Sequence, residues 1–175
     1  MGTIDLHKSD WSELTAEVIE TQEREAVLPR FSVPDAHWLG RRIVELSSDL
    51  APKITVSVRH GRRQAFLLAG EETVLDNEFW IRRKINTVER LGMASLRAGR
   101  RNTTRTEAEF YAYRGLDPLD YVIHGGAFPI HVDGVGLVGV VAVSGLSQEV
   151  DHTLAFEGLI DLRDWLTSPR REPSV

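Results

Sequence analysis

The sequence predicts one α+β domain in which helices cover an antiparallel sheet. With 175 residues, of which 42% are hydrophobic, the chain is long enough for one buried core and short for two. Segments of alternating polarity occur in two sets that are broken by glycine-containing turns, which is typical of strands joined as hairpins. Between and after these sets, apolar residues recur at helical spacing, and no repeat or linker divides the chain.

The N-terminal third of the chain predicts two helices followed by a hairpin. Residues 10–26 have helical polarity but few apolar anchors, so we expect residues 1–30 to form an N-terminal helical arm. The segment from Pro34 to Pro52 predicts a second helix, since proline is favoured at a helix start and ends one further along. Its apolar stripe consists of Leu39, Ile43, Leu46 and Leu50. Residues 53–70 alternate on both sides of His60-Gly61 and predict two strands joined by a tight turn.

A third helix is predicted to begin with Asp76 or Asn77 as its N-cap and to end at Gly92. Its apolar arc is formed by Ile81, Ile85, Val88 and Leu91. Lys84 falls on this same arc, where a charged side chain must extend to solvent, form an ion pair, or line a pocket.

The C-terminal half predicts three more strands and a closing helix. After a short helix at 104–114, the strands are expected within residues 120–126, 128–132 and 136–146. The closing helix should run over 147–166 with Ser147 as its N-cap. We therefore expect a single domain over residues 31–167 and a disordered tail over 168–175.

Composition excludes several classes of protein. The chain has no cysteine, so disulfides, a thiolate nucleophile and cysteine-ligated metal centres are excluded. An acidic, amphipathic N-terminus and the lack of long apolar runs predict a cytoplasmic protein with no membrane partner. A net charge of −5 argues against binding to nucleic acid.

One segment reverses the sign of the charge. Between residues 82 and 105 the sequence has eight basic residues and only one acidic residue, Glu89. They are Arg82, Arg83, Lys84, Arg90, Arg97, Arg100, Arg101 and Arg105. Such a run usually marks a solvated face or a contact between subunits, and it is also compatible with a site for a small anionic ligand.

Three short motifs match known sites in letters but not in context. "GVGLVG" at 134–139 is followed by a strand, whereas a dinucleotide fingerprint must open a helix. "HGGA" at 124–127 is similar to an oxyanion-hole segment, but Ser144 lies in "AVSGL" and not in a nucleophile elbow. "VRHG" at 58–61 is followed by a second strand, so a phosphate-accepting histidine is not indicated.

The remaining polar groups lie near predicted strand ends and one helix start. His124 should end one strand and Ser144 another, while Asp151 and His152 lie in the first turn of the closing helix. Asp151 can satisfy the free backbone N–H groups there by itself. His152 is either a buried, hydrogen-bonded imidazole or a functional group, since histidine titrates and binds metals readily.

Three segments together resemble the UPF0303 group within the GlcG/HbpS-like, or haem-degrading domain, family. They are "DNEFWIRRKINTVERLGMASL", "HGGAFPI" and "GVVAVSGLSQEVDH", and the resemblance covers most of residues 34–166. Two departures are Ala94-Ser95, where relatives usually carry two serines, and Ala127, where a third glycine is usual.

The resemblance implies a profilin-like, three-layer α/β/α fold with a central antiparallel sheet, and a homo-oligomer built as a ring or stacked rings. Members of the wider family include haem-binding redox sensors, a haem-binding domain attached to a cobalamin adenosyltransferase, and proteins of glycolate or diol operons. The family label does not establish catalysis, because function depends on the site and not on the fold.

Three functional hypotheses follow. In the first, the protein binds haem or another small anionic ligand, and the resemblance adds a haem-degrading activity. The expected ligand-binding residues are Trp80, Arg83, Lys84, His124, Gly125, Phe128, Ser144, Asp151 and His152. His124 and His152 are the candidate ligands of a haem iron. In the second, the protein is an interaction scaffold whose basic helix serves subunit packing; in the third, Ser144 acts with Asp151 and His152 in a hydrolase or isomerase.

Overall fold

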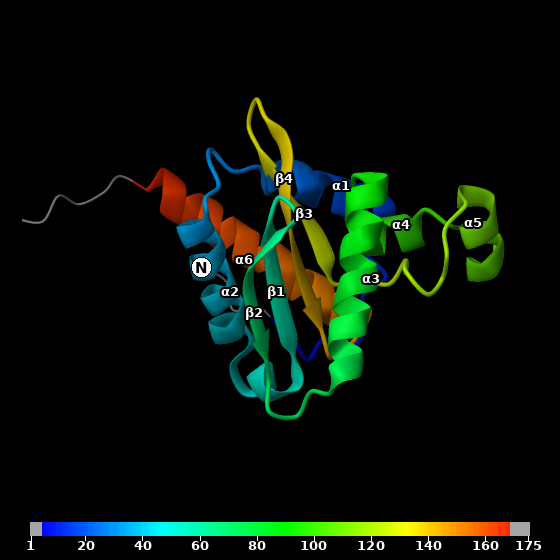
Figure 1. Ribbon diagram of the computed structural model, residues 1–175, viewed down its shortest axis with the longest axis horizontal. Helices are drawn as coiled ribbons and strands as arrows, with labels where there is room; N and C mark the ends of the chain where they lie inside the picture. The colour runs from blue at the N-terminus through cyan, green and yellow to red at the C-terminus, as the bar shows by residue number, and fades with distance from the viewer. Residues whose placement is uncertain (1–4, 169–175) are drawn as a thin grey trace, which may run out of the picture.

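The computed structural model describes residues 5–168 and has a four-stranded antiparallel sheet in the order β2-β1-β4-β3 (Figure 1). The strands are β1 (Thr55–His60), β2 (Arg63–Ala69), β3 (Ala127–Val132) and β4 (Gly136–Ser144). The helices are α1 (Ala16–Glu25), α2 (Val33–Ser47), α3 (Leu75–Leu91), α4 (Ser95–Arg100), α5 (Glu107–Arg114) and α6 (Gln148–Thr167), with a 3-10 helix, η1 (Ser48–Lys53), after α2. The predicted α+β fold is confirmed.

The sheet is the middle of three layers. Helices α2 and α6 cover one face and α3 covers the other (Figure 1). Alternate residues of β4 divide between the two faces, because side chains of a strand point to opposite sides in turn. Val141 and Val143 belong to the core under α2 and α6, whereas Val140 and Ala142 pack with α3.

Both hairpins and several helix ends follow the sequence signals. Gly61 turns between β1 and β2 with φ of 56°, and Gly92 ends α3 with φ of 68°. Ser147 caps α6 as predicted, through a hydrogen bond from the Val150 backbone N–H. The predicted end of the second helix at Pro52 was wrong, because α2 ends at Ser47 and Pro52 lies inside η1. The predicted cap of α3 was wrong: the helix begins at Leu75, and Asn77 accepts the Val74 N–H from inside the first turn.

The strand predicted within residues 120–126 was also wrong. Val122 and Ile123 are buried, but their backbones are bonded to helix side chains and not to a strand. The Thr87 hydroxyl donates to Val122 O at 2.7 Å and accepts its N–H at 3.1 Å, and Ile123 N–H donates to the Tyr111 hydroxyl at 3.3 Å. His124 therefore lies in a loop that enters β3.

The N-terminal segment packs on the domain. Ile19 of α1 is fully buried, and Glu23 accepts hydrogen bonds from Ala94 N–H and Arg97. Of the tail expected over 168–175, residues 169–175 lie outside the described part of the chain. Within residues 5–168, no helix combines the length and apolar character needed to cross a membrane.

Candidate functional site

Six of the nine predicted ligand-binding residues line one open hollow of about 330 Å³. The hollow lies between the N-terminal half of α3, the loop before β3, the end of β4 and the start of α6. The six residues are Trp80, Lys84, His124, Gly125, Ser144 and Asp151. They come from segments far apart in the sequence, so the fold brings them together.

A buried ion pair lies at the base of this hollow. Lys84 Nζ donates to Asp151 Oδ2 at 2.9 Å and to Val143 O at 2.9 Å, and the two charged side chains are 4% and 2% exposed. Burial raises the pKa of Asp151 above its usual range, while the Lys84 ammonium opposes that shift. Of the three options for Lys84, the structure shows two together: Lys84 lines the hollow and forms an ion pair, which links α3 with β4 and α6.

The same carboxylate stabilises the start of α6. Asp151 Oδ1 accepts the Leu146 backbone N–H at 3.1 Å. Leu146 precedes the Ser147 cap, so this bond fixes the loop that enters α6 and does not, as had been expected, satisfy a free N–H of the first turn. Both oxygens of Asp151 and the charge of Lys84 are thus engaged within the chain. A carboxylate on a ligand would find no free ammonium group here.

The two glycines of "HGG" allow the loop to approach this pair closely. A Cβ on Gly126, whose φ is 125°, would lie 2.3 Å from Val143 O and 2.6 Å from Lys84 Nζ. A Cβ on Gly125 would lie 2.2 Å from Gln148 O, while its N–H donates to Gln148 Oε1 at 3.2 Å. Side chains at these two positions would therefore push the loop away from the ion pair and α6.

The rim of the hollow is formed by two rings. The centroids of Trp80 and His124 are 5.4 Å apart, and Trp80 Nε1 donates to Asp76 Oδ2 at 3.0 Å. His124, whose side chain is 41% exposed, is bonded through Nε2 to Glu107 Oε1 at 2.8 Å. With the shared proton on Nε2, Nδ1 keeps a lone pair that can bind a metal, as in carboxylate–histidine–metal arrangements.

Arg83 lies just outside the hollow. Its guanidinium carbon is 4.8 Å from the centre of the Trp80 ring, and its Nη2 donates to Tyr121 O at 3.4 Å. It forms no ion pair with an acid of the described chain, and its buried Nε has no hydrogen-bond partner. Arg83 is therefore the basic group near the rim whose charge is unpaired.

His152 and Phe128 do not line the hollow. His152 is fully buried in the core under α2 and α6, with its ring 5.4 Å from that of Phe128 and its Nε2 2.9 Å from Gln22 Oε1 of α1. Burial lowers the pKa of His152 to about 3, and the nearby Arg100 acts in the same direction. Adjacent residues of a helix face different directions, so Asp151 reaches the hollow and His152 does not.

This separation bears on two of the hypotheses. His124 and His152 cannot bind opposite sides of one iron unless the core opens. The hydrolase hypothesis loses its base, because His152 is bonded to Gln22 on α1 and not to Ser144.

Sequence reasoning missed five lining residues: Asp76, Asn77, Gly145, Leu146 and Gln148. One signal was available for Asp76, which stands four residues before Trp80 and so lies beside it on the helix. Gln148 follows the cap of α6, but nothing in the sequence shows that its amide turns to Gly125.

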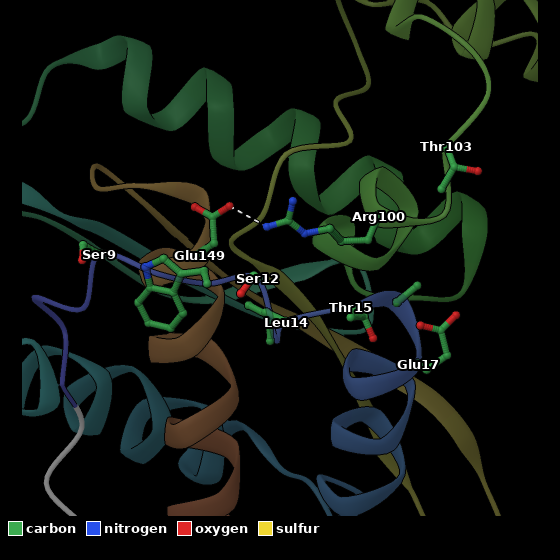
Figure 2. A pocket seen from close by; sticks show the side chains of 10 residues that line it. Ser9, Ser12, Leu14, Thr15, Glu17, Arg100, Thr103 and Glu149 are labelled. Atoms are coloured by element: carbon green, nitrogen blue, oxygen red, sulfur yellow. Dashed lines mark hydrogen bonds and ion pairs between the residues drawn. The ribbon is translucent and has the colours of Figure 1, made fainter.

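A larger hollow of about 630 Å³ lies between residues 9–17 and the side chains of Arg100, Thr103 and Glu149 (Figure 2). The Arg100 guanidinium points across it to Glu149 and donates to Oε1 at 2.8 Å (Figure 2). Its central charge is thus paired, and none of the nine predicted residues lines it.

Comparisons with known proteins agree with the resemblance in the sequence. The model of a family described as "Haem degrading protein HbpS-like" matches residues 31–160. A UPF0303 protein of Streptomyces avermitilis is 41% identical, over 86% of this chain and 93% of the relative. A UPF0303 protein of Lactiplantibacillus plantarum is 32% identical, over 81% of this chain and 91% of the relative.

Two solved structures are similar in fold. The crystal structure of the Ybr137w protein superimposes with a TM-score of 0.78 at 28% identity, covering 87% of this chain and 90% of the other. A PduOC:heme complex has a TM-score of 0.61 at 22% identity, covering 75% of this chain and 94% of the other. The second likeness concerns the fold alone.

Proposed function

Because the chain belongs to the HbpS-like haem-degrading family, and within it to the UPF0303 proteins, we propose that it binds haem at the hollow between α3 and α6. The observation that carries the proposal is the His124 side chain, which is exposed at the rim, faces an aromatic wall and is oriented by a carboxylate. A likeness in fold to a PduOC:heme complex supports it.

The residues present fit one side of a haem. His124 Nδ1 would bind the iron, Glu107 fixes the orientation of the imidazole through Nε2, and Trp80 offers an apolar face to the macrocycle. Arg83 is the suitable partner for a propionate, because its charge is unpaired and Lys84 is already neutralised by Asp151. Bound haem would supply a redox-active iron.

The side chains of the hollow favour the binding of a ligand and are not arranged for catalysis. The Ser144 hydroxyl has no histidine beside it, and the Lys84–Asp151 pair acts as a support. We therefore assign binding and orientation of the ligand to this chain, and no catalytic residue.

A hemin titration tests the proposal. The wild-type protein should shift the Soret band of hemin, and His124→Ala should abolish that shift because the iron loses its protein ligand. His37→Ala is the matched control, since His37 is an exposed histidine of α2, on the opposite face of the sheet. An unchanged Soret shift in His124→Ala would refute ligation by this residue.

A second candidate function is self-association, in keeping with the rings expected from the resemblance. Four large apolar side chains around the N-terminal half of α3 are half exposed or more: Val74, Leu75, Phe79 and Leu119. Large exposed apolar groups near one another are typical of contact surfaces. The basic helix was expected to serve this contact, but its Lys84 is buried in an ion pair within one chain.

Light scattering tests this second function. Leu75→Ser combined with Phe79→Ser should reduce an oligomer to smaller species, because the apolar contact is lost. Val135→Ser combined with Leu137→Ser is the control, since these side chains are exposed on the β3–β4 hairpin. A wild-type protein that is monomeric, or an oligomer unaffected by the α3 pair, would argue against it.

A further inference from the structure

A further cavity, of about 140 Å³, lies between the C-terminal end of α3, α4 and α5, at the edge of the molecule where α5 stands beyond α4 (Figure 1). Its base is apolar and includes Leu91, Met93 and Phe110. Its rim carries three arginines, Arg101, Arg105 and Arg114. We call this cavity the arginine groove.

The three arginines of the groove are unpaired. None of them forms an ion pair with an acid of the described chain, whereas the neighbouring Arg97 and Arg100 of α4 are bonded to glutamates. Glu109 is an acid on which the charge of Arg105 acts, but it forms no ion pair with Arg105 and instead accepts hydrogen bonds from the N–H and hydroxyl of Thr106. In a chain with a net charge of −5, this is a local excess of positive charge around one cavity.

Aromatic rings fix the positions of two of these cations. The Arg105 guanidinium carbon is 4.4 Å from the centre of Tyr113, and that of Arg114 is 5.8 Å from Phe110 and 5.9 Å from Tyr113. Cation–π contacts hold the guanidinium groups near the apolar base without neutralising them. The groove therefore offers a hydrophobic surface edged by donors that suit a carboxylate.

The size of the groove limits the apolar part of a ligand. A dry cavity of about 150 Å³ is known to hold one benzene ring. A free inorganic anion would satisfy the arginines but leave the apolar base exposed, and a neutral ring would leave the arginines unpaired. We propose that the arginine groove binds a small carboxylic acid with a single apolar ring, with the ring on the base and the carboxylate on Arg105 and Arg114. This site is separate from the proposed haem site and does not depend on it.

Two kinds of ligand carry carboxylates on a flat apolar body. One is a free aromatic acid and the other is the propionate edge of a tetrapyrrole. The volume of the groove favours the free acid, and the two sources can be separated by experiment.

Calorimetric titration with benzoate tests the proposal on the full chain. Benzoate should bind, and benzamide, which has the ring without the charge, should bind roughly tenfold more weakly or worse. Arg105→Gln combined with Arg114→Gln should weaken benzoate by a similar factor. Arg62→Gln combined with Arg63→Gln, which removes the same charge from the β1–β2 hairpin, should leave benzoate binding unchanged.

Equal binding of benzamide and benzoate, no binding of benzoate, or undiminished binding by the Arg105/Arg114 variant would each overturn the proposal. The tetrapyrrole source is tested by titrating that variant with hemin. An unchanged Soret shift is expected, and loss of the shift would assign the groove to a tetrapyrrole. Failure of the haem proposal would appear separately, in His124→Ala.

Discussion

The hollow and the arginine groove differ in whether their charged side chains are paired within the chain. In the hollow, Lys84 is bonded to Asp151 and His124 to Glu107, so its polar groups are largely engaged before any ligand arrives. In the groove, Arg101, Arg105 and Arg114 have no carboxylate partner in the described chain. The difference shows that a conspicuous charge in the sequence can serve stability in one region and remain available to a ligand in another.

The largest loss of stability should come from removing one partner of the Lys84–Asp151 ion pair in the hollow. Lys84→Met leaves Asp151 buried without its counter-charge and should lower the free energy of unfolding by about 3–5 kcal/mol. Urea denaturation would measure this loss. Adding Asp151→Asn, which removes the orphaned charge and keeps an oxygen for Leu146 N–H, should recover at least half of it. A loss below about 1 kcal/mol, usual for surface pairs, would contradict the role of this pair.

The second effect extends the comparison to a histidine that the core keeps neutral. Because the pKa of His152 falls from 6.5 in the unfolded chain to about 3 in the folded protein, the unfolded state binds an extra proton between these values. Stability present above pH 6.5 should therefore be lost as the pH falls, by about 1.4 kcal/mol per unit from this group.

Denaturation curves at pH 6.5 and at about pH 5 should thus differ by about 2 kcal/mol on account of His152. His152→Asn, which cannot take up the proton, should show a correspondingly smaller difference. The same pH dependence in both proteins would mean that His152 is accessible to solvent. His152 would then again be a candidate ligand of the haem iron.

A third test concerns the loop at Gly126, which lies against the Lys84–Asp151 ion pair. Gly126 and Gly134 both have positive φ, but only at Gly126 would a Cβ meet other atoms, Val143 O and Lys84 Nζ. Gly126→Ala should therefore cost at least about 1 kcal/mol more than Gly134→Ala in urea denaturation. Equal costs would show that the loop does not lie against the ion pair.

The smallest effect is expected in the groove. Arg105→Gln combined with Arg114→Gln removes two unpaired charges and their exposed cation–π contacts, so the free energy of unfolding should change by no more than about 1 kcal/mol per substitution. Thermal denaturation without ligand would measure it. A large destabilisation would mean that these arginines support α5, and would remove the contrast with Lys84.

Much of the fold could be predicted from local signals. Glycine turns, the Ser147 cap and the stripe of α2 act within a few residues, so the sequence reveals them directly. The error at Val122 and Ile123 arose because a short apolar segment followed by glycines has the pattern of a buried strand, although here it is a loop bonded to Thr87 and Tyr111. Periodicity reports which side chains are buried but not which partner buries them.

The site was predictable in part for the same reason. The position of Lys84 on an apolar arc indicated a buried charge. Its partner, Asp151, is distant in sequence and could be found only in the fold. His152 stands next to Asp151, and helix geometry turns its side chain to Gln22 of α1, a segment whose sequence gave no sign of this contact. Of the three arginines of the groove, the basic run over residues 82–105 contains Arg101 and Arg105 but not Arg114.

The most direct test of two separate ligand regions is a hemin titration followed at the Soret band, with and without saturating benzoate. Two independent sites predict the same Soret shift at the same hemin concentration in both titrations. Displacement of hemin by benzoate, or no shift of the Soret band in either titration, would contradict this account.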